Sequence, residues 1–261
     1  MTDHDTFLKT IIDRPDDDTA RLVFADWLAE NGDPDRGEFI RIEVELARRD
    51  PDGFDDEPRR SDLFARRSEL LKQHGKRWLA PFQSYAKESG FERGFVHELE
   101  VPVEVFLTRG EEWFAAAPIT RVRFARFEVW VDTIRQGLWL ADALFGSPLL
   151  SRLAVINLER NQMNASDMEW FARHPDLSRL RELKLEWNLI RTEGAIVLAG
   201  MAQLRGLESL DLMNNGITDR GARAIAESPH LAGLKELRIT RNPIRKTTWA
   251  LLEDRFGLAL M

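Results

Sequence analysis

The chain has 261 residues, of which 43% are hydrophobic and 31% charged, as is typical of a globular protein with one large or two modest domains. Its formal net charge of −7 disfavours a general nucleic-acid binder, because such binding depends on Lys and Arg contacts to phosphate. Since the sequence has no cysteine, disulfides, thiolate catalysis and Cys-ligated zinc or iron are excluded.

The N-terminus does not have the features of an export signal. Residues 1–5 are acidic, whereas a signal peptide starts with cationic residues followed by an apolar stretch. An apolar region at residues 137–150 is broken by Asp142, Gly146 and Pro148, and is shorter than the roughly 18 residues that suggest a membrane span. We therefore expect a soluble, cytoplasmic protein without membrane contact.

Residues 1–82 are predicted to form a helical domain. Asp16, Asp17 and Asp18 form an acidic first turn before a helix that stops at Gly32. Two further helices should follow, separated by an acidic surface loop at residues 50–58. The expected apolar residues of the three helices are Leu22, Val23, Phe24, Trp27 and Leu28 in the first, Phe39, Ile42 and Leu46 in the second, and Leu63, Phe64, Leu70 and Leu71 in the third.

A family resemblance covers roughly the first 50 residues of this domain. The motifs that carry it are LVFADWL at residues 22–28, NGDP at 31–34 and RGEFIR at 36–41. Together they resemble the repeat-companion domain of planctomycete proteins, a bacterial domain found beside repeat arrays, and Arg93-Gly94-Phe95-Val96 resembles its usual junction. The resemblance implies an architecture and supplies no reaction or catalytic residue.

Residues 91–150 are predicted to hold irregular repeats at the start of a second domain, residues 91–261. Val96, Leu99 and Val101 have the spacing L-x-x-L-x-L, and the same spacing recurs further along the chain. Its second copy consists of Ile119, Val122 and Phe124. Helical apolar spacing at residues 103–117 and 132–146, with Leu138, Ala141 and Phe145 in the latter, predicts a helix after each copy.

Residues 153–244 repeat with a period of 27. Leu153, Leu180, Leu207 and Leu234 are 27 residues apart, and each is followed eight positions later by an asparagine. The four asparagines are Asn161, Asn188, Asn215 and Asn242. Such a repeat predicts that the leucines form a continuous core, and that each asparagine satisfies backbone groups where a strand ends.

The repeats resemble leucine-rich repeats of the ribonuclease-inhibitor type. The template L-x-x-L-x-L-x-x-N-x-L is followed by Gly194-Ala195-x-x-Leu198-Ala199 and Gly221-Ala222-x-x-Ile225-Ala226, which look like its helical halves. The resemblance implies an α/β solenoid, a horseshoe with a parallel sheet on the concave side and helices on the convex side. Thr192 and Thr218 are expected as helix N-caps, and residues 245–261, with Trp249, Leu252 and Phe256, as a C-terminal cap.

Motifs that carry chemistry are not found. The sequence has no phosphate-binding loop, dinucleotide fingerprint, H-E-x-x-H or G-x-S-x-G, and its five histidines lack ligand spacing. Asp26 and Glu30 are four residues apart on one helix, but we expect Asp26 to join two helices by hydrogen bonding and Glu30 to face solvent. We therefore expect a protein that is not an enzyme and holds no metal or cofactor.

The repeat phase places the residues between the template leucines on the concave face. Trp187 and Met213 are apolar at positions that are usually polar, and arginines stand in the adjoining column, which is the composition of a protein-binding hot spot. The alternative is that Trp187 packs over its neighbours. The candidate binding residues are Trp187, Met213, Arg160, Arg241, Arg126, Glu186, Lys184, Asp211 and Arg238.

The predicted function is a protein-interaction module or scaffold that binds a protein partner on the concave face and is monomeric when unbound. Two alternatives remain open. One is a regulator of a nucleotide-hydrolysing partner, by analogy with other ribonuclease-inhibitor-like solenoids. The other is a hydrolase with its site in the helical domain, which would require converging carboxylates in a pocket.

Overall fold

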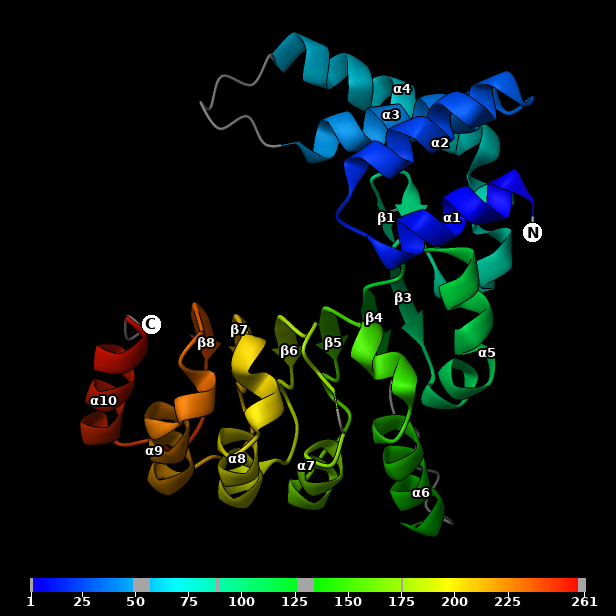
Figure 1. Ribbon diagram of the computed structural model, residues 1–261. Coiled ribbons are helices and arrows are strands. Elements are labelled where there is room, and N and C mark those ends of the chain that lie inside the picture. The colour runs from blue at the N-terminus through cyan, green and yellow to red at the C-terminus, as the bar shows by residue number, and fades with distance from the viewer. Residues whose placement is uncertain (1, 49–56, 88–89, 126–133, 175, 258–261) are drawn as a thin grey trace. The chain divides into compact units, whose positions relative to one another are not determined.

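The computed structural model describes residues 2–48, 57–87, 90–125, 134–174 and 176–257 (Figure 1). The chain divides into two compact units. The first comprises Met1–Leu99 and Glu111–Thr120, and the second comprises Glu100–Gly110 and Arg121–Met261. The chain therefore passes from the first unit to the second, back to the first at residue 111, and again to the second at residue 121.

The first unit is mainly helical. Its helices begin where the sequence supplies caps: Thr2 and Asp5 form a capping box at α1, Asp17 caps α2, and Asp33 caps α3. The elements are α1 (Asp3–Asp13), α2 (Asp18–Glu30), α3 (Pro34–Ala47), α4 (Glu57–Leu79), the 3₁₀ helix η1 (Ala80–Tyr85), and the short strands β1 (Phe91–Glu92) and β2 (Phe95–Val96). The helix predicted to stop at Gly32 is confirmed as α2.

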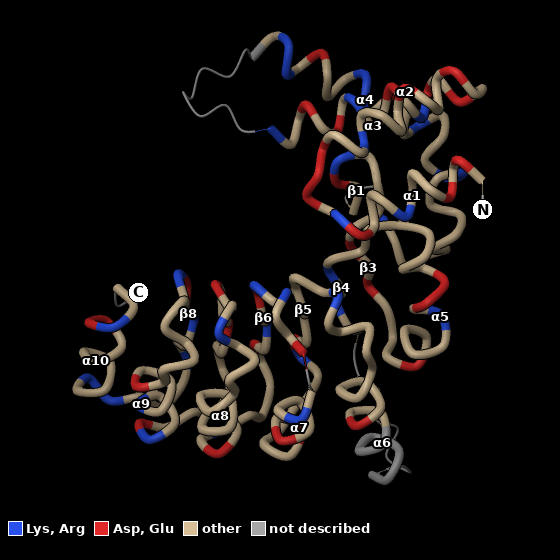
Figure 2. Tube along the Cα trace, viewed as in Figure 1, with Lys and Arg blue, Asp and Glu red and all other residues tan. Residues whose placement is uncertain are grey.

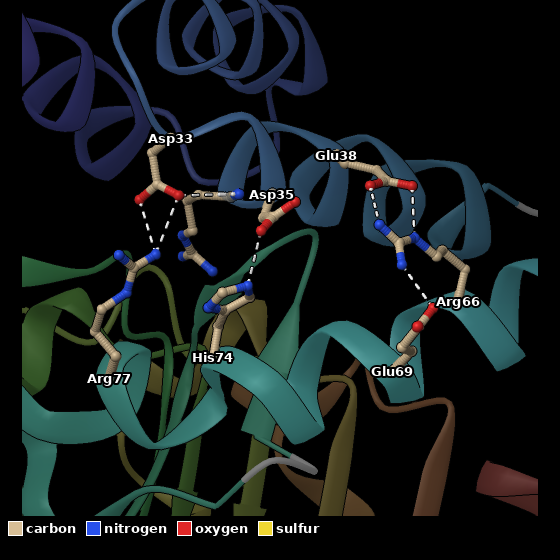
Figure 3. A network of polar contacts seen from close by, with 8 residues as sticks. Asp33, Asp35, Glu38, Arg66, Glu69, His74 and Arg77 are labelled. Carbon is tan, nitrogen blue, oxygen red and sulfur yellow. Dashed lines mark hydrogen bonds and ion pairs between the residues drawn. The ribbon is translucent and has the colours of Figure 1, made fainter.

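Charged pairs join α3 to α4 along their length (Figure 3). Arg77 binds both carboxylate oxygens of Asp33 at 3.0 and 3.1 Å, and His74 Nε2 lies 2.8 Å from Asp35 Oδ2. Further along, Arg66 binds Glu38 through two nitrogens at 2.8 and 2.9 Å. Because the partners on α4 descend in number as those on α3 ascend, the two helices run antiparallel.

A tight hairpin between β1 and β2 packs against α3. Its two turn residues, Arg93 and Gly94, both have positive φ, the conformation of the turn that best joins two short antiparallel strands. A Cβ at Gly94 would lie 2.6 Å from Ile40 Cγ1, so the close approach to α3 also requires glycine. The Gly94 carbonyl accepts a hydrogen bond of 2.5 Å from Arg36 Nη2.

The Arg36 guanidinium lies among four aromatic rings of the first unit. Its Cζ is 4.7 Å from the ring centroid of Trp78 and 5.3 Å from that of Phe95. The rings of Phe39 and Phe91 are within 5.7 Å. Burial lowers the pKa of Arg36 to about 10, so the group stays charged at neutral pH and is stabilised by the ring faces.

The second unit alternates strands with helices. Its elements, with the two that span both units, are β3 (Glu98–Val101), α5 (Val103–Ala116), β4 (Arg121–Phe124), α6 (Ile134–Phe145), η3 (Pro148–Arg152), β5 (Val155–Asn157), α7 (Ala165–Phe171), β6 (Glu182–Lys184), α8 (Arg191–Ala199), η4 (Ala202–Gly206), β7 (Ser209–Asp211), α9 (Asp219–Glu227), η5 (Pro229–Leu231), β8 (Glu236–Arg238) and α10 (Lys246–Phe256). The helices predicted at residues 103–117 and 132–146 are confirmed as α5 and α6.

The strands form one six-stranded sheet in chain order, and β4 to β8 pair in parallel. Residues one repeat apart stand side by side, so that Ile156, Leu183, Leu210 and Leu237 form a single row. All four side chains are buried. Helices α7 to α9 lie along one side of strands β5 to β8 in Figure 1. Because the four side chains are buried, we assign this row to the face that the helices cover.

The repeated asparagines bond to backbone groups where the strands end, as predicted. Asn188 Nδ2 donates to the carbonyls of Leu158 and Leu185, both at 2.9 Å. Its Oδ1 accepts from the backbone N–H groups of Asn161 and Met163, also at 2.9 Å. Each asparagine thus ties its own repeat to the preceding one, because one side chain satisfies both donors and acceptors that leave the strand ladder.

Small residues let the helices of adjacent repeats pack closely. A Cβ at Gly221 of α9 would lie 2.9 Å from Ile217 Cγ2 and 3.1 Å from Ala195 Cβ of α8. Ala195 and Ala222 are themselves fully buried. The Gly-Ala pairs noted in the sequence are therefore the contact between neighbouring helices.

Some local predictions are wrong. Phe64 was expected on a buried stripe, but it is 48% exposed and its ring lies against Arg60, while the neighbouring Leu63 is half-buried. Thr192 is not a helix cap. It lies within α8, where its hydroxyl bonds to that of Thr218 at 2.7 Å. Thr218 occupies the N-cap position of α9, as predicted, although its side chain makes no capping hydrogen bond.

The loop predicted at residues 50–58 falls mostly outside the described residues, and α4 already begins at Glu57.

Candidate functional site

The candidate residues within the strands, Lys184, Asp211 and Arg238, lie on the sheet face opposite α7, α8 and α9, which we call the open sheet face. Strand side chains alternate between two faces, and the row of buried leucines faces the helices, so the residues between them face away. Figure 2 shows both acidic and basic positions along these strands. The open sheet face is thus polar, with few apolar side chains.

One group on this face combines an aromatic ring with two arginines, and we call Arg160, Trp187 and Arg241 the aromatic–arginine cluster. Trp187 is 40% exposed. Arg160 Cζ lies 5.3 Å from its ring centroid and Arg241 Cζ lies 5.7 Å from it. Both distances allow cation–π attraction, so the structure brings together three of the residues singled out in the sequence.

The backbone at these three positions is left-handed. Arg160, Trp187 and Arg241 have φ of 57°, 57° and 58°, and Asn214, at the equivalent position of the repeat between Trp187 and Arg241, has φ of 54°. The strand ladder continues through this column, since Trp187 N–H donates to the Met213 carbonyl at 2.9 Å. Asn accepts this conformation readily, whereas a bulky Trp or Arg does so at some cost.

Three carboxylates lie together next to the cluster, and we call Glu159, Glu186 and Asp211 the acidic group. Burial raises the pKa of Asp211, whose carboxylate accepts a hydrogen bond from Met213 N–H at 2.9 Å. Partial burial, with the nearby charges of Asp211 and Glu159, also raises the pKa of Glu186. Glu186 is therefore repelled by Asp211 and Glu159, and the charge of Arg160 offsets part of this repulsion.

Basic residues on the same face already partner some carboxylates. Arg123 pairs with Glu159. Lys184 Nζ is 3.0 Å from Glu182 Oε1, and Arg238 Nε is 2.8 Å from Glu236 Oε1. Lys184 and Arg238 are thus held in pairs within the sheet and do not join the aromatic–arginine cluster.

The two remaining predicted residues are Met213 and Arg126. Met213 is half-buried, and its carbonyl accepts from Trp187 N–H. Arg126 lies outside the described residues.

Leu189 and Asn214 are two residues of this region that the sequence did not predict. Leu189 is 50% exposed. In the described part of the second unit, Leu189 and Trp187 are the large apolar side chains that are exposed. The repeat template would have indicated Leu189, because position 189 falls between the buried Asn188 and Ile190. Asn214 was not considered because its importance depends on the backbone and on a neighbour one repeat further on.

The alternative site in the helical unit does not form a carboxylate pair in a pocket. Asp26 is exposed and binds Arg41 Nη2 of α3 at 2.6 Å, as expected for a link between helices, while Glu30 faces solvent. A cavity of about 30 Å³ in this unit is lined by Pro15, Asp16, Arg21, Glu92, Arg93, His97, Pro118 and Thr120. That volume has room for water and not for a substrate molecule.

Neither a metal site nor a membrane span is found in the described residues. Within the residues that the structure describes, no three His, Asp or Glu side chains gather in a way that would hold a metal ion. In the same part of the chain, no helix combines the length and apolar character needed to cross a membrane.

Comparison with known families adds one finding to this geometry. Residues 178–199 and 204–226 each match the family model described as Leucine Rich repeat. These two segments are leucine-rich repeats. They contain β6 with α8, and β7 with α9, so Trp187 lies inside the first matched repeat and Asn214 inside the second. Comparison with curated proteins gives no match.

Proposed function

We propose that the strand–helix repeats form a horseshoe solenoid whose concave side is the open sheet face, and that this face binds a protein partner. In this proposal the protein is a scaffold without catalysis or cofactor, and residues 1–82 form a helical domain that accompanies the solenoid. Leucine-rich repeats generally mediate protein–protein interaction, which supports the proposal at the level of the family.

The observation that carries the proposal is the exposed aromatic ring between two arginines. Trp187 stands out from a largely polar face, and Trp and Arg are the residues most enriched among those that dominate binding energy. The face around it is patterned with both charges, which would give a partner specificity and orientation.

Photo-crosslinking tests where a partner binds. A photoreactive phenylalanine analogue replaces Trp187 on the open sheet face, or Arg223, an exposed residue of α9 on the helix side, as the matched control. Expressed in the source cell, the variant at 187 should give a discrete crosslinked protein that the variant at 223 does not. A product from position 223 alone would overturn the proposal, because it would place the partner on the helices.

A further inference from the structure

The aromatic–arginine cluster has unused hydrogen-bonding capacity. In the described part of the chain, neither the Arg160 nor the Arg241 guanidinium makes a hydrogen bond or an ion pair, although the charge of Arg160 attracts Glu186; each guanidinium lies beside the Trp187 ring. A guanidinium carries its N–H donors in its own plane, where they can bind a carboxylate through two parallel bonds. The cluster therefore offers donors to a negatively charged group.

The left-handed backbone of this column does not suit most of its residues. Position 214 has the residue that a left-handed backbone favours, whereas positions 160, 187 and 241 have residues that do not. Strained backbone of this kind is often kept where a side chain has a function. At Trp187 the conformation goes with a large exposed ring.

The register explains how both arginines reach one ring. Arg160 stands one repeat before Trp187, and Arg241 stands two repeats after it, with Asn214 at the position between them. The Asn214 side chain is short, and Arg241 extends past this position to lie 5.7 Å from the ring centroid of Trp187. The result is one aromatic ring with two guanidinium groups within 6 Å of its centroid.

The acidic group limits what the cluster can bind. Glu186 immediately precedes Trp187, and Glu159 immediately precedes Arg160. An extended polyanion such as nucleic acid would bring its repeated charges against Glu159, Glu186 and Asp211, which repel it. A single carboxylate beside an apolar side chain avoids that repulsion and uses both properties of the cluster.

We infer that the aromatic–arginine cluster binds a segment of the protein partner in which an Asp or Glu residue is next to a large apolar residue. The carboxylate binds the guanidinium groups of Arg160 and Arg241, and the apolar side chain covers the Trp187 ring. This inference rests on the proposed function, since it specifies the chemistry of the segment that the open sheet face receives.

A displayed library of random 12-residue peptides, selected on the full-length protein, tests the inference. Binders should be enriched in Asp or Glu beside Leu, Ile, Phe or Met. A synthetic peptide from the best binder should lose at least 10-fold in affinity with Trp187→Asn and about 3- to 10-fold with Arg160→Gln or Arg241→Gln. Arg223→Gln on α9, also an exposed arginine, is the matched control and should bind like the parent.

The peptide itself supplies the second half of a double-mutant cycle. Replacing its acidic residue with the corresponding amide should cause a loss on the parent protein and little further loss on the double variant Arg160→Gln/Arg241→Gln, because both contacts of the carboxylate are already absent there. If the affinity losses caused by the peptide change and by the arginine changes multiply when they are combined, the inference is overturned. Binders without acidic enrichment would overturn it as well.

The same peptides distinguish failure of the inference from failure of the proposed function. Binders that are weakened by Arg238→Ala or Asp211→Asn but not by Trp187→Asn would overturn the inference and leave the open sheet face as a binding surface. Binders that are insensitive to every one of these substitutions would overturn both.

Discussion

At the scale of single residues, Trp187 allows binding and folding to be separated. Its equivalent in the next repeat is Asn214, so Trp187→Asn supplies a side chain suited to the left-handed backbone while removing the ring. Relief of backbone strain and loss of cation–π contacts are each worth about 1 kcal/mol and oppose each other. We predict a free energy of unfolding within about 1 kcal/mol of the parent in urea titrations.

Leu185→Ala provides the contrast for that measurement. Leu185 is fully buried two residues earlier, and its truncation should cost about 2–5 kcal/mol. A loss of similar size in Trp187→Asn would contradict the prediction, and would mean that the ring belongs to the packing of the repeats.

Asn188 should be among the polar residues most important for stability. Its side chain accepts from two backbone N–H groups and donates to carbonyls of two repeats, all within the buried part of the unit. Asn188→Ala leaves these groups without partners, and we predict a loss of about 3 kcal/mol or more. Asn157→Ala, on the open sheet face, is the control in the same urea titration. An equal loss there would show that the hydrogen bonds between Asn188 and the backbone of two repeats are not the cause.

At the scale of elements, the acidic group makes strand β7 sensitive to pH. Because the pKa of Asp211 is raised above its ordinary 3.8, the native state holds the proton more tightly than the unfolded state does. Stability from this group is therefore fully present below about pH 3.8 and falls as pH rises through the raised pKa.

Asp211→Asn keeps an acceptor for Met213 N–H and removes the buried charge. We predict that this variant is more stable than the parent at neutral pH, and that the difference disappears towards pH 3.8. Thermal unfolding between pH 3.5 and 8 measures it, with Asp254→Asn, at an exposed position of α10, as the control. A variant that is less stable at neutral pH would show that the attraction of Arg238 outweighs the cost of burial.

The elements show why some features could be predicted from the sequence and others could not. The leucines and asparagines were placed correctly because a fixed period determines which side of the strand each faces, as Leu183 and Asn188 illustrate. The sequence also placed Trp187 away from the core. It did not indicate that Asp211 is buried or that Arg241 reaches Trp187 from two repeats away, because both depend on the length and packing of neighbouring side chains.

At the scale of the whole molecule, the two units are interleaved in sequence. Glu111–Thr120 belongs to the first unit although it follows Glu100–Gly110 of the second. Trp113 in this segment is fully buried, its Nε1 donates to the Pro81 carbonyl at 3.2 Å, and its ring lies 5.4 Å from that of Tyr85. The repeats cannot be separated from the helical unit by a single cut without disrupting this core.

A fragment of residues 91–261 should therefore fold poorly. It keeps Trp113 and Phe114, both buried in the full chain, but loses Pro81, Tyr85 and the helices of the first unit, so apolar surface is exposed to solvent. The end of a repeat array also needs a cap to stay soluble. We predict that the fragment self-associates in light scattering and unfolds over a broader urea range than the full chain measured beside it. A monomeric fragment with one sharp transition would contradict the prediction, and would mean that the repeats fold without the first 90 residues.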